Sequence, residues 1–577
     1  MPDLSHLTFE APGPGLWMAD GVHQPLPSTA LGTTDREAFD RGIRLGAERY
    51  GLMGDGALGA KVHRFSYGQP RFFLKVPPGE PAAARAHFDE LVAGNFVLAD
   101  RFRAAQQTLD TRRWESDRHH WDTVGKPALL ARTAALTAVD PADLDDDGIF
   151  THLDAVYYHL SRTEEFHFYL NPVMGVPIGM YLHQAREWTG ASVAEVAALL
   201  VGASPVSVGE EPELETLVET IRVDESAAAL LDGSDDKPGD ATSRLQALRS
   251  RDGAVGKAAK IYVDLVGYRT AGGWDAMDFY ALEEPSGILA TIKRSLEGAW
   301  PQLDPAAHAA LRDRVPADHQ TEFDALLADA REYMPIRDER DVYCNLPVAG
   351  LIRRSVLEIG RRIKAAGLID DVKLATEADL PELRLLLGGT ADSSLPTELA
   401  ERQDFRNTYT YNDIPPALGT PNAMPIPPDW LPPAAQKLAL GEFAHMEAMF
   451  GARPGGPVTE PARPAPSPGD TTTLTGAIAS PGVYEGPARV VLGPHDFAKI
   501  QQGDVLIAAT TNPAFGVVLA KLGAIVTDHG GALSHTAIVA REFGLPTIVG
   551  AGKATQTFVD GQRVRVDAEA GVVEPIG

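Results

Sequence analysis

The chain has 577 residues, enough for three or four folding units, and its 44% hydrophobic and 23% charged residues are typical of globular proteins. Its formal net charge of −27 repels nucleic acid phosphates and anionic lipids, which disfavours polyanion binding as a function. The single cysteine, Cys344, excludes an intrachain disulfide and a thiolate metal cluster. Because the sequence also has no long apolar run and no signal-like start, it predicts a cytoplasmic protein.

Residues 1–452 are predicted to form a mainly helical domain, called here the helical body. After a segment rich in Pro and Gly, β-formers on both sides of Gly68-Gln69-Pro70 predict a short hairpin that turns at those residues. From about Pro81 helical spacing dominates. The clearest predicted helical segments are Ala82–Thr108, Phe150–Leu170, Val193–Leu200, Leu351–Ala366 and Pro433–Phe450.

Residues 453–470 form the clearest boundary in the chain. This stretch, RPGGPVTEPARPAPSPGD, is rich in proline and has almost nothing to bury. It predicts a partly extended linker with a reach on the order of 50 Å, at roughly 3.1 Å per residue. Such a tether would carry the domain that comes after it between two separate sites, and that domain is expected to pack only lightly on the body.

Residues 471–577 have β/α character and a net charge of only −2. Short apolar runs separated by glycines and helical segments predict strands. These runs are Ala488–Leu492, Val505–Ala508, Ala524–Val526, Thr547–Val549 and Arg563–Val566. The predicted fold class is therefore a mainly α N-terminal domain followed by a C-terminal β/α domain.

The segment from Ala524 to Pro546 carries the sharpest chemical signal. A buried strand runs into Gly530-Gly531, and Ser534 is placed to cap a helix that opens at His535 and stops at Gly544. Unpaired N–H groups and the helix dipole favour an anion at such a helix start. The pattern therefore fits an imidazole that carries a phosphoryl group, with the two glycines allowing close approach, although a simple helix-start histidine would have the same spacing.

This C-terminal domain resembles the swivelling phosphohistidine domain of phosphoenolpyruvate-utilising enzymes, which include phosphoenolpyruvate synthase, pyruvate phosphate dikinase and rifampin phosphotransferase. The resemblance rests on Gly476–Gly482, Gly503–Ile507, Thr510–Phe515, the Gly-Gly-x-x-Ser-His box, Ala537–Glu542 and Asp560-Gly561 with Val566-Asp567. It implies that His535 becomes phosphorylated, that Gly530, Gly531, Ser534 and Arg541 bind the phosphoryl group, and that residues 453–470 are a hinge. Residues 471–577 then constitute the swivel domain.

In complete members of that family an ATP-grasp domain charges the histidine. No segment of this sequence resembles a glycine-rich, lysine-bearing nucleotide module, and no phosphoenolpyruvate barrel follows the swivel domain. The resemblance therefore implies a separate ATP-grasp partner that supplies ATP and holds any Mg²⁺. No pair of histidines has ligand spacing with a carboxylate, so no metal site is predicted in this chain.

The helical body more faintly resembles the acceptor-binding domain of rifampin phosphotransferase and the histidine-bearing subunit of phenylphosphate-synthase-like enzymes. The matching segments are Gly15–Pro27, Arg331–Asp338, Arg353–Gly360 and Asp370–Val372. Arg331 and Arg337 are candidates to hold the moving phosphoryl group, although both also fit helix charges paired with neighbouring carboxylates. Pro335 replaces the lysine of an Arg-Glu-x-x-Lys pattern, which makes rifampin itself a less suitable acceptor.

A general base is also needed, and two histidines are candidates for it. His152, His159 and Phe166 are seven residues apart and share one helix face, with His167 beside Phe166. That face would wall an acceptor pocket with His159 as the base, or it would be ordinary core with satisfied histidines. His23, in the Pro-rich opening, competes for the role of base through the family resemblance alone.

The sequence predicts the phosphocarrier and acceptor-binding component of a split dikinase-type phosphotransferase that acts on a small, phenol-like hydroxyl. Phenylphosphate synthases and two-component alkylphenol-phosphorylating enzymes are the nearest models. The alternative is a non-catalytic phosphocarrier or regulatory module whose body binds a protein. An enzyme should gather the aromatic and histidine residues of the body in one concave pocket, whereas a carrier should present a flat face.

Overall fold

A computed structural model of the chain describes residue 4 and most of the residues from 6 to 576. The residues left out are 1–3, 5, 22–23, 33, 73–80, 207–210, 233–238, 271–272, 299–301, 422–425, 452–472, 512–514, 516–517 and 577. The predicted linker 453–470 and the candidate base His23 lie outside the described residues.

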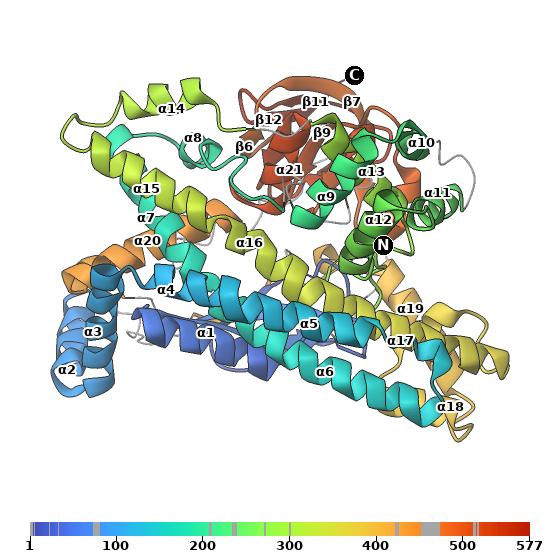
Figure 1. Ribbon diagram of the computed structural model, residues 1–577. Helices are drawn as coiled ribbons and strands as arrows, with labels where there is room; N and C mark the ends of the chain where they lie inside the picture. Colours follow the sequence, from blue (N-terminus) through green and yellow to red (C-terminus); the bar gives the residue numbers. More distant parts are fainter. Residues whose placement is uncertain are drawn as a thin grey trace.

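The body is helical, as predicted (Figure 1). Its helices are Arg36–Tyr50 (α1), Pro81–Gly94 (α2), Phe96–Thr111 (α3), Arg113–His120 (α4), Lys126–Thr137 (α5), Asp146–Tyr169 (α6), Asn171–Thr189 (α7), Val193–Ala198 (α8), Pro212–Arg222 (α9), Glu225–Ala228 (α10), Asp240–Arg249 (α11), Ala254–Val266 (α12), Ser286–Glu297 (α13), Pro305–Arg312 (α14), Gln320–Tyr333 (α15), Pro335–Arg340 (α16), Leu346–Ala365 (α17), Leu380–Leu387 (α18), Leu395–Thr408 (α19) and Pro433–Phe450 (α20).

The regular helices of the body are interrupted at several places, including a π-helical turn at Trp121–Gly125 between α4 and α5. The segment predicted as one helix over Ala82–Thr108 is two helices, because the Asn95 side chain caps α3 by accepting hydrogen bonds from Val97 N and Leu98 N. A second π-helical turn, Asp341–Asn345, joins α16 to α17. Such turns frequently lie at functional sites, because they alter the direction of the side chains along a helix.

Within its described residues the helices of the body build three apolar cores, and a small sheet builds a further one around Trp17, Phe65 and Tyr67. One is built mainly by α1, α3, α7, α15 and α20, a second by α6, α17, α18 and α19, and a third by α9, α11, α12 and α13. Amphipathic helices bury one face each, and burial of that face supplies most of their stability. No described helix combines the length and the apolar character needed to cross a membrane.

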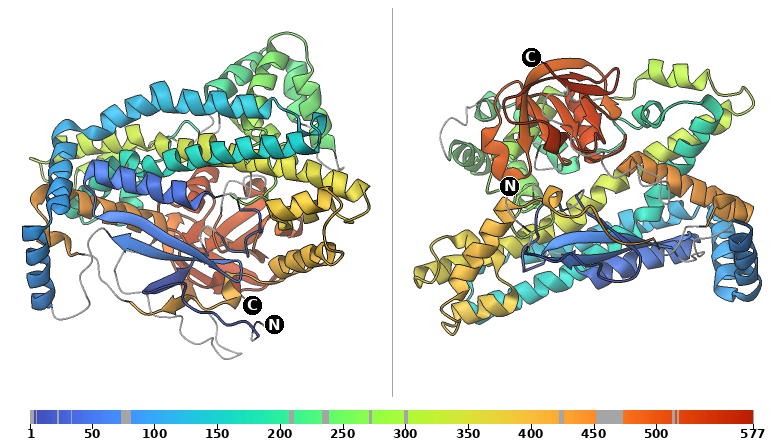
Figure 2. Two further views of the ribbon diagram at one scale, coloured as in Figure 1. Left: turned by 90° about the horizontal axis from the view of Figure 1, so that it is seen from below. Right: turned by 180° about the vertical axis from the view of Figure 1, so that it is seen from behind.

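A small antiparallel sheet runs beside α1, with strand order β2-β3-β1-β4 (Figure 2). Its strands are Leu16–Ala19 (β1), Gly54–Val62 (β2), Phe65–Phe72 (β3) and Ala417–Gly419 (β4). The predicted hairpin exists, but its turn was misplaced. The chain turns at His63 and Arg64, which have φ of 49° and 72°, while Gly68 pairs with Gly59 inside the hairpin.

The swivel domain has one eight-stranded sheet with the order β5-β12-β11-β7-β8-β9-β10-β6, in which β7 to β10 are parallel. The strands are Leu474–Thr475 (β5), Ala477–Ser480 (β6), Val483–Val491 (β7), Asp504–Ala508 (β8), Leu522–Thr527 (β9), Thr547–Val549 (β10), Arg563–Asp567 (β11) and Val572–Pro575 (β12). Alternate residues of β8 enter different apolar cores, Val505 and Ile507 one and Leu506 and Ala508 the other. Helices His535–Phe543 (α21) and Ala554–Thr557 (α22) complete the predicted β/α domain.

The swivel domain is docked on the body, between the α9–α13 group and the α8–α14 side (Figure 1). Leu533 is 1% exposed and belongs to the body's first core. Gly531 N and Leu533 N donate to Met449 O (3.1 Å) and Ala448 O (2.8 Å) near the end of α20. The expectation of light packing is therefore wrong for this arrangement, because an apolar side chain of the swivel domain completes the body's own core.

Polar contacts hold a second edge of the swivel domain. Tyr411 OH donates to Asp528 Oδ2 at 2.8 Å. Asn412 bonds through its amide to Thr555 Oγ1 (2.9 Å) and Gln556 Nε2 (2.8 Å). These contacts and the Leu533 contact fix which face of the swivel domain meets the body.

Candidate functional site

His535 is the first residue of α21, at the end of the loop after β9. The Ser534 side chain accepts a hydrogen bond from Ala537 N (3.3 Å), and Gly544 ends the helix with a left-handed φ of 62°. Both helix boundaries predicted from the sequence are confirmed. The imidazole therefore lies at the positive end of a short helix, partly buried under the docked body.

The two glycines before this helix have specific steric reasons for being glycine. Gly530 has a φ of 117°, which other residues rarely adopt. A Cβ on Gly531 would lie only 2.3 Å from Ala448 O of the body. In the docked arrangement the space beside Gly531 is thus filled by the body's backbone, and phosphate contact by these glycines stays a prediction.

The hydrogen bonds of His535 indicate which ring nitrogen is free. Its Nδ1 lies 3.3 Å from Thr511 Oγ1, and the Thr511 hydroxyl donates its hydrogen to Thr536 Oγ1 at 3.0 Å. With that hydrogen engaged, Thr511 accepts from Nδ1–H. The Nε2 atom then keeps its lone pair, which makes it the nucleophilic nitrogen of the ring.

The surroundings of His535 favour the neutral imidazole. Burial is the main cause, and the nearby positive charge of Arg337 adds to it, so that the pKa of His535 falls to about 3. The side chain is therefore neutral throughout the physiological pH range. A neutral imidazole with a free Nε2 is the form that can accept a phosphoryl group.

Arg337 lies on α16 and is 7% exposed. Its Nη1 is 3.4 Å from Asp338 Oδ1, but its Nε and Nη1 make no hydrogen bond to any described residue. The positive charge of Arg337 also lowers the pKa of Arg541 to about 10, after burial as the larger cause. Arg337 thus brings unsatisfied N–H donors close to the helix that carries His535.

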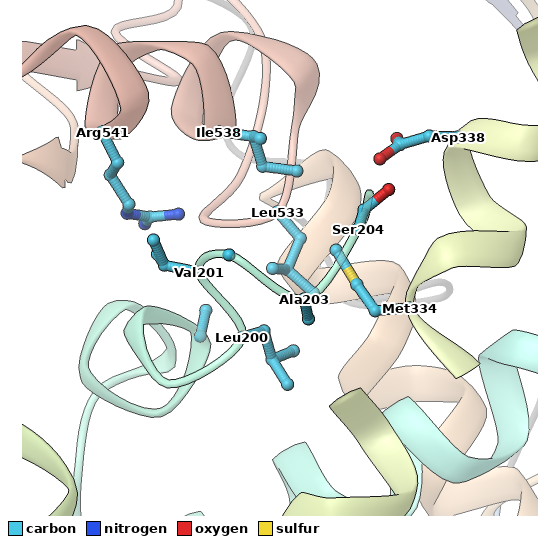
Figure 3. A pocket seen from close by; sticks show the side chains of 11 residues that line it. Leu200, Val201, Ala203, Ser204, Met334, Asp338, Leu533, Ile538 and Arg541 are labelled. Carbon is cyan, nitrogen blue, oxygen red and sulfur yellow. The ribbon is translucent and has the colours of Figure 1, made fainter. Parts of the chain in front are cut away.

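Arg541 lies two turns along α21 and donates to Ala532 O at 2.7 Å. It lines a small pocket between the domains, together with Leu533 and Ile538 (Figure 3). The body contributes the loop after α8, with Leu200–Ser204, and also Met334 and Asp338. Arg541 stabilises the turn before α21 in this arrangement, and a phosphoryl contact for it stays a prediction.

Several buried polar groups near the α16–α17 junction have no hydrogen-bond partner within the described part of the chain. They include both carboxylate oxygens of Glu164, both amide atoms of Asn345 and Nε2 of His445. Glu164 is 0% exposed and Asn345 is 1% exposed. Buried polar groups in native proteins are nearly always paired, by protein groups, ordered water or a ligand, so this cluster is a candidate site for a polar ligand.

Charged side chains of α16 and the π-helical turn shift the pKa values of these unpaired groups. Arg337 and Arg340 both lower the pKa of His445, with burial as the main cause, to about 3. Burial raises the pKa of Glu164 well above its usual value, and Asp341, in the π-helical turn, raises it further. The turn from Arg337 to Asp341 therefore lies between the surroundings of His535 and those of Glu164.

The α6 side of the site is aromatic. His167 Nδ1 lies 3.1 Å from Arg340 O, and its ring contacts Trp274 edge-on with centroids 5.3 Å apart. Phe168 contacts the same tryptophan at 6.4 Å and Phe39 of α1 at 4.0 Å. Of the predicted acceptor residues, His167 thus lies beside the cluster of unpaired groups.

The other predicted acceptor residues lie elsewhere on α6. His159 and Phe166 line a separate pocket between α5 and α6, where His159 Nε2 is 2.9 Å from Thr133 Oγ1. Burial lowers the pKa of His159 to about 4. His152 is 7% exposed and does not line this pocket. The residues that the sequence placed together on α6 therefore lie in two different environments. The reason is that other elements pack against α6 on more than one side.

Arg331 has contacts that differ from those predicted. Its Nη1 donates to Leu199 O (2.6 Å) and Val201 O (2.9 Å) at the end of α8. It therefore stabilises the loop that borders the interdomain pocket. Of the two predicted phosphoryl-holding arginines, the structure brings only Arg337 near His535 in the described arrangement.

Sequence reasoning missed Glu164, Asn345, His445 and Thr511 as parts of the site. Thr511 stood in a matched motif but had no assigned role. Glu164 lies three residues before His167 on the same helix face, which was a usable signal. Asn345 and His445 had none, because Asn345 lies in the π-helical turn and His445 in α20, far apart in the chain. No described cluster of three or more His, Cys, Asp or Glu side chains could hold a metal ion.

Two protein-family models match parts of the chain. Residues 500–571 match the family "PEP-utilising enzyme, mobile domain", and residues 169–343 match "Rifampicin phosphotransferase fourth domain". The first match contains His535, and the second contains Arg337 and reaches the π-helical turn.

Individual relatives match over different parts of the chain. Rifampicin phosphotransferase from Bacillus cereus is 42% identical over 101 residues, which cover 18% of this chain and 12% of the relative. A probable phosphoenolpyruvate synthase from Staphylothermus marinus is 46% identical over 102 residues, 17% of this chain and 12% of the relative. Chondramide synthase cmdD from Chondromyces crocatus is 26% identical over 589 residues, 97% of this chain and 14% of the relative.

The chain is therefore similar to PEP-utilising enzymes, with the match to their mobile domain at residues 500–571. The chain spans about one seventh or less of the length of these three relatives.

Proposed function

We propose that this chain is the phosphocarrier and acceptor-binding component of a dikinase-type phosphotransferase. In this proposal His535 receives a phosphoryl group that originates from ATP and passes it to a hydroxyl of a small aromatic acceptor bound in the helical body. ATP and Mg²⁺ act at an ATP-grasp protein that meets this chain as a separate partner. The observation that carries the proposal is the docking of the swivel domain with His535 near Arg337, a buried arginine whose Nε and Nη1 have no hydrogen-bond partner among the described residues.

The chemistry assigned to each residue follows from its contacts. Nε2 of His535 attacks phosphorus during charging, and Nδ1–H stays hydrogen-bonded to Thr511. The unsatisfied N–H groups of Arg337 are proposed to hold the phosphoryl oxygens during discharge, since an arginine offers several donors to such a group. Docking of Leu533 in the body's core excludes water from the transfer.

The aromatic acceptor is proposed from the lining of the body. His167, Phe168 and Trp274 form an aromatic wall next to the unpaired Glu164. A phenol, with a pKa of about 10, needs less help to lose its proton than an aliphatic alcohol. An acceptor with a ring and one hydroxyl therefore fits both features.

The proposal is tested by separating charging from discharge. The chain is charged with phosphoramidate, a small-molecule donor for histidine, and in a parallel reaction with ATP, Mg²⁺ and an ATP-grasp protein. We expect an acid-labile, base-stable phosphoprotein that transfers its label to phenols. The His535→Ala variant should take no label, while the control His119→Ala, a change at an exposed histidine, should behave as the unchanged protein. Label on His535→Ala, or ATP turnover by the chain alone, would refute the proposal.

A further inference from the structure

The side chain of Glu164 lies fully buried in α6 with neither carboxylate oxygen bonded to any described residue. The neighbouring Glu165 shows the contrast, because its carboxylate is 2.5 Å from Arg41 Nε and 3.4 Å from Arg162 Nη1. A buried acid normally has such a partner. Packing within the described residues does not explain Glu164, and its two oxygens are open to a hydrogen-bond donor from a bound hydroxyl.

The position of Glu164 relative to the phosphoryl route supports this reading. His167, one turn further along α6, contacts Arg340 O and lies 3.6 Å from Asp341 Oδ1. Arg337 lies one turn before Asp341, and its charge reaches His535. Glu164 therefore lies near Asp341, at one end of the turn from Arg337 to Asp341, and Arg337 lies at the other end. The aromatic side chains of His167, Phe168 and Trp274 lie beside Glu164.

We infer that Glu164, in its ionised form, binds the acceptor hydroxyl and takes its proton when the phosphoryl group leaves His535. The inference rests on the proposed function and adds the general base, a role for which the sequence offered only His159 and His23. The substrate class it implies is an aromatic ring with a hydroxyl that reaches Glu164 while the ring lies against Trp274.

The transfer step exchanges one bond to phosphorus for another. The acceptor oxygen forms a bond to phosphorus, and the bond between phosphorus and Nε2 of His535 breaks, returning its electron pair to the ring. The hydroxyl proton passes to an Oε atom of Glu164. The proton on Nδ1 stays there, hydrogen-bonded to Thr511, so the imidazole leaves as the neutral ring. The proton on Glu164 returns to solvent after the product departs.

The electrostatic surroundings of Glu164 suit a base. Burial, Asp35 and Asp341 raise the pKa of the carboxyl group, and Arg36 opposes them. The titratable groups that face it are Asp35 and Arg36 at the start of α1, His167 on α6, and Asp341 and Cys344 in the π-helical turn. A carboxyl group of raised pKa is the stronger base once it is ionised, so the rate of transfer should rise as pH rises through that pKa.

The test compares Glu164→Gln with the matched control Glu165→Gln and with Glu164→Asp. Each protein is charged at His535 with phosphoramidate, and the decay of the phosphohistidine label is followed with a series of phenols of increasing acidity. Glu164→Gln should charge normally but discharge about 10²- to 10⁴-fold more slowly to phenol itself. The difference in discharge rate between Glu164→Gln and the unchanged protein should become smaller as the phenol becomes more acidic. The unchanged protein should discharge faster as pH rises and Glu164 ionises, and this rise should be missing in Glu164→Gln. Glu164→Asp should recover part of the rate.

Several outcomes would overturn the inference. Discharge of Glu164→Gln at the rate of Glu165→Gln would do so. An equal loss for every phenol would also do so, because it would show a structural role. A charged wild-type protein that discharges to no phenol would instead refute the proposed function, and with it this inference. Circular dichroism and thermal melting of each variant separate these results from misfolding, and if Glu164→Gln does not fold, the same dependence on phenol acidity is read from Glu164→Asp.

Discussion

A single methyl group at position 531 should separate the swivel domain from the body. In Gly531→Ala the new Cβ would lie 2.3 Å from Ala448 O and 2.8 Å from both Ala448 C and Glu447 O. All three are backbone atoms, so no side chain can move aside. Gly531 does not have a positive φ, so alanine should not strain the swivel domain itself.

The cost to docking depends on the contacts that the clash would break. Two interdomain hydrogen bonds, from Gly531 N and Leu533 N, contribute about 0.5–1.5 kcal/mol each. Burial of Leu533 contributes about 1.5–3 kcal/mol. If all three are lost, docking weakens by about 2.5–6 kcal/mol, which corresponds to a shift of roughly 10²- to 10⁴-fold in the docking equilibrium.

Fluorescence energy transfer between the domains measures this shift. Cysteines replace Phe96 on the body (77% exposed) and Val559 on the swivel domain (64% exposed). The native Cys344 is buried and its thiol pKa is raised by burial, so it should stay unlabelled. We expect lower transfer efficiency in Gly531→Ala, slower discharge from His535 to the acceptor and undiminished charging. The control Gly94→Ala, a position where a Cβ meets open space, should change none of these. Unchanged energy transfer and discharge in Gly531→Ala would refute this account of docking.

Three further predictions concern the residues around His535. Arg337→Met should lower the discharge rate about 10²- to 10³-fold, as loss of a preorganised donor does, with charging by phosphoramidate unchanged, and equal discharge rates would contradict its role. Thr511→Val should shift the ¹⁵N signals of the His535 ring toward a mixture of tautomers, whereas an unchanged spectrum would show that another group holds Nδ1–H. Docking should weaken as pH falls from 6.5 toward 3, by at most about 1.4 kcal/mol per pH unit, because the docked His535 has its pKa lowered to about 3 and the undocked ring binds a proton first. The same fluorescence pair measures this dependence, and His535→Gln should lose the His535 contribution to it.

The sequence alone predicted the elements that rest on local chemistry. Ser534, His535 and Gly544 specify the start and end of α21 by themselves, because capping and a left-handed C-terminal residue depend on neighbours within a few positions. Short apolar runs separated by glycines likewise predicted the strands β7 to β11 of the swivel domain. The hairpin turn was misplaced for the same local reason, since a Gly-Gln-Pro stretch is a strong turn signal although His63 and Arg64 take the positive φ values.

The tertiary structure decided which of the predicted residues meet. Arg331 and Arg337 have the same local pattern, yet one is bound to carbonyls at the end of α8 and the other faces His535. Glu164 and Glu165 are adjacent and chemically identical, but of the two only Glu165 has an ion-pair partner among the described residues. The physical reason is that a charge acquires its role from what surrounds it after burial, and those surroundings come from helices hundreds of residues apart in the chain.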